Sequence, residues 1–215
     1  MSVSIPRIDQ MFLHLDRWRH LPAYQLERRI DIFFSVYLVD VLREITGDDL
    51  VDTIIPELPL KRDLVVPGNS SHHSVKVDYA VFTRSRDKVY FVELKTDDQS
   101  RRTEQDDYLN RAQALGFRPI VDGIRQILLH TDAHQKYFHL AHSLAALGYL
   151  DLPDDLATFH YPQVRRGLTE RLEAIETTGP ESAIEVVYVQ PNANRDDGTE
   201  HLTIDFNQFA DHVDK

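Results

Sequence analysis

Two acidic residues and a lysine lie in neighbouring segments whose side chains alternate between polar and apolar. Residues 74–82 read Ser-Val-Lys-Val-Asp-Tyr-Ala-Val-Phe, and residues 89–95 read Val-Tyr-Phe-Val-Glu-Leu-Lys. This two-residue alternation predicts β-strands at 75–82 and 89–95, and the polar stretch 83–88 between them predicts a hairpin turn. Because successive side chains point to opposite faces of a strand, Glu93 and Lys95 share one face.

The position of the turn fixes which residues of the two strands face each other. A turn centred between Ser85 and Arg86 places Asp78 opposite Glu93 and Lys76 opposite Lys95. Directly opposed side chains have Cβ atoms about 4.5–5.5 Å apart, a distance at which like charges are destabilising. Two carboxylates this close favour a shared proton or a bridging cation. The alternative is a solvated charge ladder, in which each acid forms an ion pair with a lysine placed diagonally across the two strands.

The chemistry of the available side chains selects the kind of cation. The sequence contains no cysteine, and its eleven histidines show no convergent set of three metal ligands. Carboxylate oxygens prefer hard cations, so the expected ion is Mg²⁺, with Mn²⁺ as a substitute.

Helical patterns surround the predicted hairpin. Apolar residues at three- and four-residue steps predict a long helix over about 22–46, with a shorter helix at about 9–19 before it. Further helices are expected at about 103–115, 122–129, 134–147 and 163–175. Strands are expected at 54–61, 183–190 and 202–206, the last before a terminal helical turn. Pro56 and Pro59 mark the first of these as an irregular or edge strand.

This order predicts an α/β fold with a mixed sheet covered by helices on both faces. The length of 215 residues, without a long linker, predicts a single domain over 1–215. No basic segment followed by an apolar one opens the chain, and no apolar run is long enough to span a membrane, so we expect a cytoplasmic protein without a membrane partner. The formal net charge of −11 argues against general attraction to nucleic acid. A bound divalent cation or a local basic patch can reverse that field nearby.

The acidic pair, the lysine and the order of elements together resemble the PD-(D/E)XK nuclease superfamily. The signature stands here as Val77-Asp78 followed by Glu93-Leu94-Lys95, with valine in place of the proline of the idealised motif. The resemblance implies a restriction-endonuclease-like αβββαβ core with additional C-terminal helices. This core covers about 22–115 and the strand at about 183–190, with a helical insertion at about 120–178.

The resemblance also implies roles for individual residues. Asp78 and Glu93 become ligands of a divalent cation, together with the backbone carbonyl of Leu94. Lys95 becomes the residue that positions or helps to activate the attacking water. Members of the superfamily often add an acid from the first helix, for which Glu27 is the first choice and Glu44 the alternative.

The segment after the motif is similar to RecB-like members of the superfamily, which carry Gln and Tyr on the following helix. Gln105 and Tyr108 have two residues between them, whereas those members have three. Gln105 is a candidate for contact with a metal-bound water or with nucleic acid. The alternative is that Gln105 is an ordinary exposed helix residue. Arg101 and Arg102 are candidates for phosphate contact, or part of a solvated turn.

These features predict a Mg²⁺-dependent nuclease that hydrolyses phosphodiester bonds, with DNA as the expected partner. The setting is restriction, repair or a mobile element, the expected mode is endonucleolytic, and a homodimer is possible. The alternative is a catalytically inactive protein on the same fold with a binding or regulatory role. The amino-acid sequence leaves open whether the substrate is DNA or RNA and which nucleotide sequence the protein recognises.

Overall fold

The structure is a computed structural model that describes residues 27–66, 68, 74–96, 101–131, 133–157, 168–192 and 201–213. The first half of the described chain forms α2 (Glu27–Thr46), β1 (Leu50–Lys61), α3 (Arg62–Val65), β2 (Ser74–Thr83), β3 (Lys88–Leu94), α4 (Thr103–Leu115) and α5 (Phe117–His130). The second half forms α6 (His134–Ala146), β4 (Leu150–Asp151), α7 (Asp154–Ala157), α8 (Leu168–Glu173), β5 (Glu176–Thr177), β6 (Ala183–Gln190), β7 (Leu202–Asp205) and α9 (Phe206–Val213).

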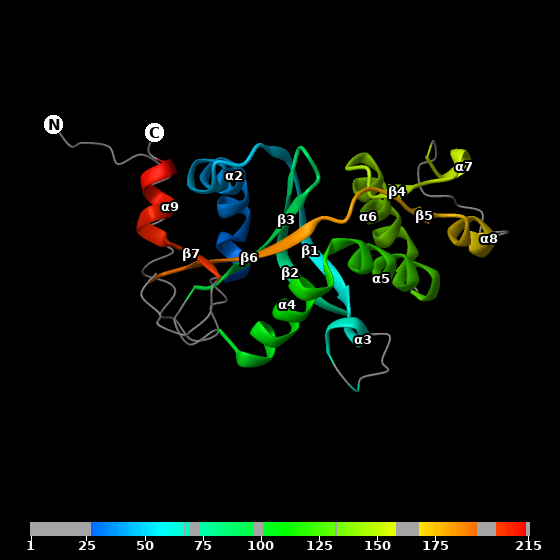
Figure 1. Cartoon of the computed structure of the whole chain (residues 1–215), viewed down its shortest axis with the longest axis horizontal. Helices are drawn as coiled ribbons and strands as arrows, with labels where there is room; N and C mark the ends of the chain where they lie inside the picture. Colours follow the sequence, from blue (N-terminus) through cyan, green and yellow to red (C-terminus); the bar gives the residue numbers. More distant parts are fainter. Residues whose placement is uncertain are drawn as a thin grey trace.

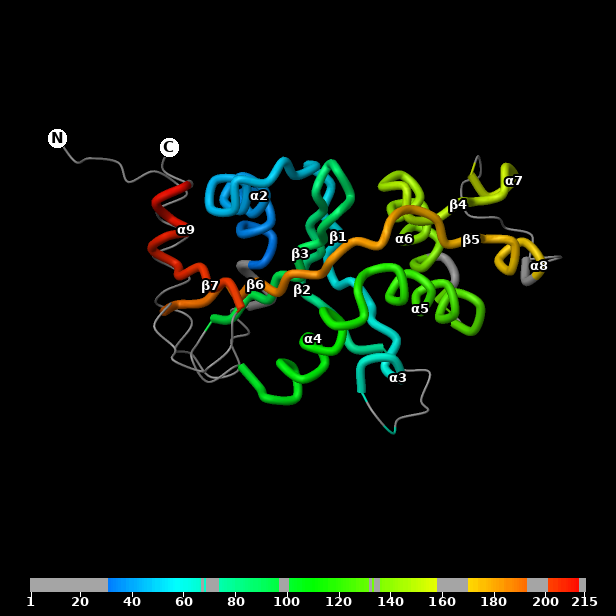
Figure 2. The backbone as a smooth tube through the Cα atoms, in the orientation of Figure 1, coloured from blue at the N-terminus to red at the C-terminus, as the bar shows by residue number. Residues whose placement is uncertain are grey.

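A mixed five-stranded sheet lies at the centre, in the order β1-β2-β3-β6-β7 (Figure 1). The pairs β1–β2 and β2–β3 are antiparallel, whereas β3–β6 and β6–β7 are parallel. The prediction of a mixed α/β sheet flanked by helices is confirmed. Between β3 and β6 the chain passes through α4 to α8 and a small sheet of β4 and β5, as the tube in Figure 2 shows.

The two faces of the sheet carry two separate hydrophobic clusters. On one face Ala80, Phe82 and Phe91 pack with residues of α4, α5 and α6. On the other face Tyr79, Val81 and other strand residues pack with α2 and α9, two helices that lie side by side in Figure 1. The cluster changes with each step over 79–82 of β2 and 89–92 of β3, so these parts of the strands keep the regular two-residue alternation that the sequence shows.

The register of the hairpin is the predicted one. The paired residues run from Tyr79 with Val92 to Phe82 with Val89, as a turn centred between Ser85 and Arg86 requires. Arg86 has a φ of 60°, in the left-handed region that tight turns often need. The ladder ends at Tyr79 and Val92, one pair before Asp78 and Glu93.

The helix before the sheet and the first strand largely follow the prediction. α2 ends at Thr46, and Gly47 follows it with a φ of 75°, whereas residues 22–26 and the helix predicted at 9–19 lie outside the described residues. β1 is an edge strand that contains Pro56 and Pro59, as predicted, but it begins at Leu50 rather than Ile54. A break in register between Leu50 and Ile54 explains why the alternation there was not visible.

The later helices agree in kind and differ in their bounds. α4 covers the predicted residues, and Gly116, with a φ of 77°, separates it from α5. α5 begins at Phe117 rather than near 122. Pro119 lies in its first turn and does not interrupt the helix, because a missing N–H group at that position breaks no intrahelical bond. α8 occupies only 168–173 of the predicted 163–175, of which 163–167 lie outside the described residues. The short elements α3, α7, β4 and β5 were not predicted. No helix among the described residues is long and apolar enough to cross a membrane.

Candidate metal and active site

Asp78 lies where β2 and β3 separate. Its Oδ2 atom accepts a hydrogen bond of 2.8 Å from the backbone N–H of Leu94. The side chain of Asp78 therefore binds the backbone of β3 just beyond the last ladder pair. Asp78 follows the alternation of Ala80 and Phe82, so it lies on the face that α4 covers.

Glu93 lies opposite Asp78 and is fully buried, with 0 % of its surface exposed. Its Oε2 atom accepts a hydrogen bond of 3.0 Å from Lys95 Nζ and a second, very short one from Gln105 Nε2. Its Oε1 atom is also buried but has no hydrogen-bond partner. An unpaired carboxylate oxygen in the interior is costly. Two donors thus fix one oxygen of Glu93 and leave the other available to a ligand.

Burial raises the pKa values of both acids. Burial, with the nearby Asp78 carboxylate as the second cause, raises the pKa of Glu93 to about 8. Burial also raises the pKa of Asp78, although the Leu94 N–H group and Lys95 oppose that shift. The interaction between the two carboxyl groups raises the pKa of Glu93 further and opposes the rise in the pKa of Asp78. Without a cation, the pair therefore tends to hold a proton between them.

Lys95 is held at the site by its backbone as well as by its side chain. Its N–H group donates a 2.8 Å hydrogen bond to the carbonyl of Val189 on β6, which continues the strand interaction one residue past Leu94. Its side chain is only 6 % exposed and reaches Glu93. Lys76, expected opposite Lys95, is instead exposed and pairs with Glu57 at 2.6 Å. A solvated charge ladder therefore does not describe this end of the hairpin.

Helix α4 covers the acid pair and brings two predicted residues to it. Gln105 contacts Glu93 directly, so it is not an ordinary exposed helix residue. Tyr108, one turn later, donates a hydrogen bond of 3.1 Å to the carbonyl of Lys76. Burial and the nearby Glu93 carboxylate raise the pKa of Tyr108 above its usual range. Gln105 and Tyr108 therefore form one wall of the site.

The two candidate acids of the first helix lie far apart. Helix α2 packs on the face opposite the acid pair, and the carbonyl of Asp31 accepts a hydrogen bond from Tyr79, next to Asp78. Glu27 begins the helix one turn earlier, but its side chain lies outside the described residues, so its role stays a prediction. Glu44 lies about 25 Å further along the helix axis and contacts His212 of α9 at 2.5 Å. The structure does not bring Glu44 to the acid pair.

Arg101 is not available to a phosphate group. Its side chain is 4 % exposed, and its Nε atom donates to both carboxylate oxygens of Asp106 at 3.0 and 3.1 Å. Its guanidinium lies 4.0 Å from the centre of the Tyr188 ring. Arg102, at the start of α4, is exposed and remains a candidate for phosphate contact.

The donor set suits a hard cation with few protein ligands. Among the described residues, no group of three or more His, Asp or Glu side chains is arranged to hold a metal ion. Two carboxylates with buried, directed oxygens are present, and the Leu94 carbonyl is the third candidate ligand. Mg²⁺ keeps several of its waters and needs only one or two protein carboxylates. The residues present therefore fit such an ion, with the unpartnered Oε1 atom of Glu93 as the clearest sign.

Comparison of the chain with models of known protein families, with curated proteins and with solved structures finds no match. The function of the chain is therefore inferred from the geometry of the site.

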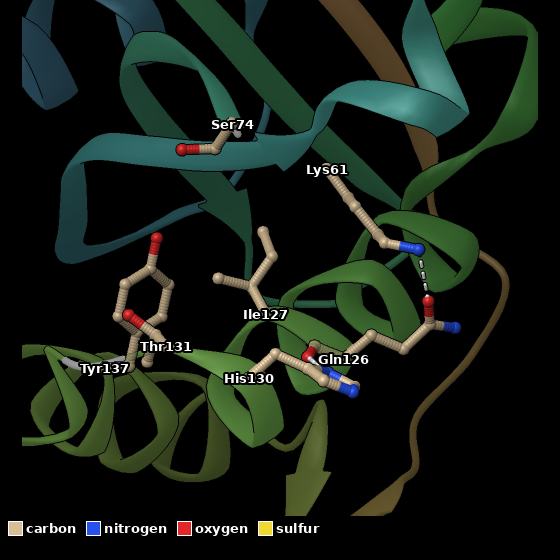
Figure 3. A pocket seen from close by; sticks show the side chains of 7 residues that line it. All are labelled: Lys61, Ser74, Gln126, Ile127, His130, Thr131 and Tyr137. Atoms are coloured by element: carbon tan, nitrogen blue, oxygen red, sulfur yellow. Dashed lines mark hydrogen bonds between the residues drawn. The ribbon is translucent and has the colours of Figure 1, made fainter. Parts of the chain in front are cut away.

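A separate hollow of about 170 Å³ lies between the start of β2 and the helices α5 and α6 (Figure 3). It is lined by Lys61, Ser74, Gln126, Ile127, His130, Thr131 and Tyr137. Lys61 already donates to Gln126 Oε1 at 2.6 Å and to Asp63 at 2.8 Å. The positive charge of Lys61 is thus compensated by a carboxylate of the protein. The acid pair is therefore a stronger candidate site than this hollow.

Two residues beside the site, Asp106 and Tyr188, were not predicted from the sequence. Tyr188 is the Cα partner of Glu93 in the parallel ladder between β3 and β6, and its hydroxyl donates a very short hydrogen bond to Asp106. About ninety residues separate the two strands, and the sequence carries no signal for the register of so distant a parallel pair.

Proposed function

We propose that this protein is a Mg²⁺-dependent nuclease that hydrolyses phosphodiester bonds of DNA. The observation that carries the proposal is the state of Glu93, a fully buried carboxylate fixed through one oxygen, with the other oxygen unpartnered beside Asp78. A stable fold gains nothing from burying an acid in this way, whereas a cation site needs it.

The arrangement of elements supports a restriction-endonuclease-like fold of the PD-(D/E)XK superfamily. The main elements follow the order helix, three strands, helix and, after further helices, a strand parallel to the third. The Asp78 and Glu93-Leu94-Lys95 motif lies where the second and third strands separate. This agreement between motif and topology is the reason to favour a nuclease over other metal-dependent hydrolases.

Each residue of the site then has a distinct task. A divalent cation, when bound, supplies a Lewis acid for the phosphoryl oxygen and lowers the pKa of a water molecule. Asp78 and Glu93 hold that cation, together with the Leu94 carbonyl. Lys95, beside Glu93, orients the attacking water and offsets negative charge on the phosphate.

The net charge of the chain fits this scheme only with the cation in place. At −11 the protein repels a polyanion, and two adjacent carboxylates add to that repulsion at the site. Cation binding reverses the local charge. Substrate binding is therefore expected to depend on Mg²⁺ or Mn²⁺ as well as cleavage.

One observation favours a second candidate, a catalytically inactive binding or regulatory protein on the same fold. Lys95 and Glu93 are both buried and bonded to each other, which is also how a structural ion pair looks. Such a protein is expected to gain no stability from divalent cations, because a ligand stabilises a fold only if it binds the folded state.

The two candidates separate in one experiment. Purified protein and Asp78→Ala are incubated with supercoiled plasmid, linear duplex DNA, single-stranded DNA and RNA, each with Mg²⁺, Mn²⁺ or EDTA. We expect cation-dependent nicking or linearisation of plasmid by the wild type and none by the variant. Equal inactivity of both proteins on every substrate, together with a melting temperature that millimolar Mg²⁺ does not change, would overturn the nuclease proposal in favour of the inactive protein.

A further inference from the structure

A second cluster of polar side chains lies beside the proposed metal site. Arg101, Asp106 and Tyr188 contact one another. The Nε atom of Arg101 donates to both carboxylate oxygens of Asp106, the hydroxyl of Tyr188 also donates to Asp106, and the Arg101 guanidinium lies over the Tyr188 ring. Arg101 is 4 % exposed, Asp106 20 %, and Tyr188 is fully buried. We name these three residues the α4 clamp.

The α4 clamp joins the first turn of α4 to β6 at the level of Glu93. Asp106 directly follows Gln105 in α4, and Tyr188 is the ladder partner of Glu93. Each end of the clamp is therefore immediately next to one partner of the Gln105–Glu93 hydrogen bond. The clamp fixes the distance between the helix that carries Gln105 and the strand that carries Glu93.

Stability alone is a weak explanation for this cluster. Removing Arg101 and Asp106 from water costs free energy that their attraction only partly repays, and an apolar set of the same shape often stabilises as well or better. What the cluster supplies is geometry, because a planar guanidinium held by two oxygens and an aromatic ring has little freedom to move.

We propose that the α4 clamp consists of positioning residues, which hold Gln105 on Oε2 of Glu93 so that Oε1 points to the cation. The inference rests on the proposed metal site and adds residues that the motif does not contain. Groups that orient a metal ligand typically change metal affinity or activity by about 10- to 100-fold when they are removed. The clamp does not contact the free Oε1 atom of Glu93 and acts through Gln105, so we expect a loss of metal affinity or activity at the lower end of that range, about 10-fold.

The test compares two tyrosine-to-phenylalanine variants that remove the same atom. Tyr188→Phe removes the hydroxyl that bonds Asp106, and Tyr149→Phe removes a hydroxyl that bonds Ser182 at 3.0 Å. Both tyrosines are at most 1 % exposed and belong to the same hydrophobic cluster. Tyr149→Phe is therefore the matched control for any general loss of stability.

Two readouts are measured on the full chain, the dissociation constant of Mn²⁺ and the kcat and KM of cleavage. For Tyr188→Phe we expect about tenfold weaker Mn²⁺ binding and about tenfold lower kcat, with KM within twofold of wild type. For Tyr149→Phe we expect all three within twofold. Equal behaviour of the two variants overturns the inference.

A double variant tests whether the clamp acts through Gln105. In a Gln105→Leu background, Tyr188→Phe is expected to cause no further loss of Mn²⁺ affinity or kcat, because the bond it supports is already absent. Fully additive losses overturn the inference.

Asp78→Asn distinguishes a failure of the clamp inference from a failure of the proposed metal site. If it abolishes Mn²⁺ binding while Tyr188→Phe matches Tyr149→Phe, only the clamp is wrong. If the wild type neither binds Mn²⁺ nor cleaves, the proposed function fails and the clamp inference fails with it.

Discussion

The acids that contact the two ends of the β2–β3 hairpin lie in opposite environments. At the turn end, Asp48 accepts hydrogen bonds from Tyr90 and from Lys88 Nζ, and these two contacts lower the pKa of its carboxyl group. At the open end, burial and the neighbouring Asp78 raise the pKa of Glu93. One carboxylate is satisfied by the protein, and the other retains an oxygen without a partner.

We propose that this difference distinguishes a structural acid from a functional one. Asp48 connects the loop after α2 to β3 and lies 29 % exposed, so its charge costs little and its bonds contribute to the fold. Glu93 is placed where charge is expensive and is only partly compensated by Lys95 and Gln105. Such local cost is expected where a ligand completes the site.

The largest expected effect is on catalysis. Asp78→Asn removes one negative charge from the proposed cation site, and we expect the rate of plasmid cleavage to fall by about 10³-fold or more, since the cation contributes several kcal/mol to the transition state. Asp48→Asn is the matched control at the other end of the hairpin, with an expected rate within threefold of wild type. Comparable losses in both variants would mean that the two ends do not differ in function.

The second prediction concerns stability and has the opposite sign from most core substitutions. Glu93→Gln keeps the shape of the side chain but removes the cost of protonating it, because the unfolded side chain is ionised at pH 7 and the folded one, with a pKa raised to about 8, is mostly neutral. The cation-free protein is therefore expected to become more stable by about 2 kcal/mol at pH 7. Urea unfolding in EDTA measures this difference. The same variant is expected to lose the increase in melting temperature that Mg²⁺ gives the wild type. A destabilised variant that still responds to Mg²⁺ would contradict the assigned role of Glu93.

The third prediction is the pH dependence of that gain. The pKa of Glu93 is raised from 4.5 to about 8 on folding, so the folded state keeps a proton that the unfolded state releases. The stability that this proton contributes is fully present below about pH 4.5 and is lost as the pH rises toward 8. The advantage of Glu93→Gln over wild type should therefore grow from pH 5 to pH 8 in EDTA. An advantage independent of pH would show that the charge of Glu93 is not its origin.

The smallest effect is expected at the turn end. Asp48→Asn weakens the bonds to Lys88 and Tyr90, and we expect a loss of about 1 kcal/mol at pH 7. Because folding lowers the pKa of Asp48 below its ordinary 3.8, the contribution is present above that pH and disappears as the pH falls through the lowered value. Chemical unfolding at pH 7 and pH 3 measures both. An unchanged Mg²⁺ response in this variant completes the contrast with Glu93→Gln.

The sequence predicted local structure well, because neighbouring residues determine it. The register of the hairpin followed from the alternation of side chains and the length of the turn, and α4 followed from its helical pattern. Tertiary packing decided the parts that were missed or wrong. Arg101 pairs with Asp106 in the first turn of α4, and the ring beneath its guanidinium belongs to Tyr188, far away in sequence. Exposure of such an arginine cannot be judged before the position of β6 is known.

For the candidate site too, local patterns were predictable from the sequence and tertiary packing was not. Asp78 and Glu93 were placed opposite each other by register alone, and the contact of Gln105 with Glu93 shows that the helix after the motif turns toward them. The free state of Oε1 and the complete burial of Glu93 depend on how α4 covers the sheet. Glu44 lost its candidacy because the direction of α2 places it beside α9.

Anomalous diffraction from a crystal grown with Mn²⁺ tests the central claim most directly. The account predicts a strong anomalous peak within coordination distance, about 2.2 Å, of Asp78, of Glu93 Oε1 and of the Leu94 carbonyl. It also predicts that a Glu93→Gln crystal treated in the same way lacks this peak. A fully occupied Mn²⁺ elsewhere in the molecule, with no peak between Asp78 and Glu93, would contradict it.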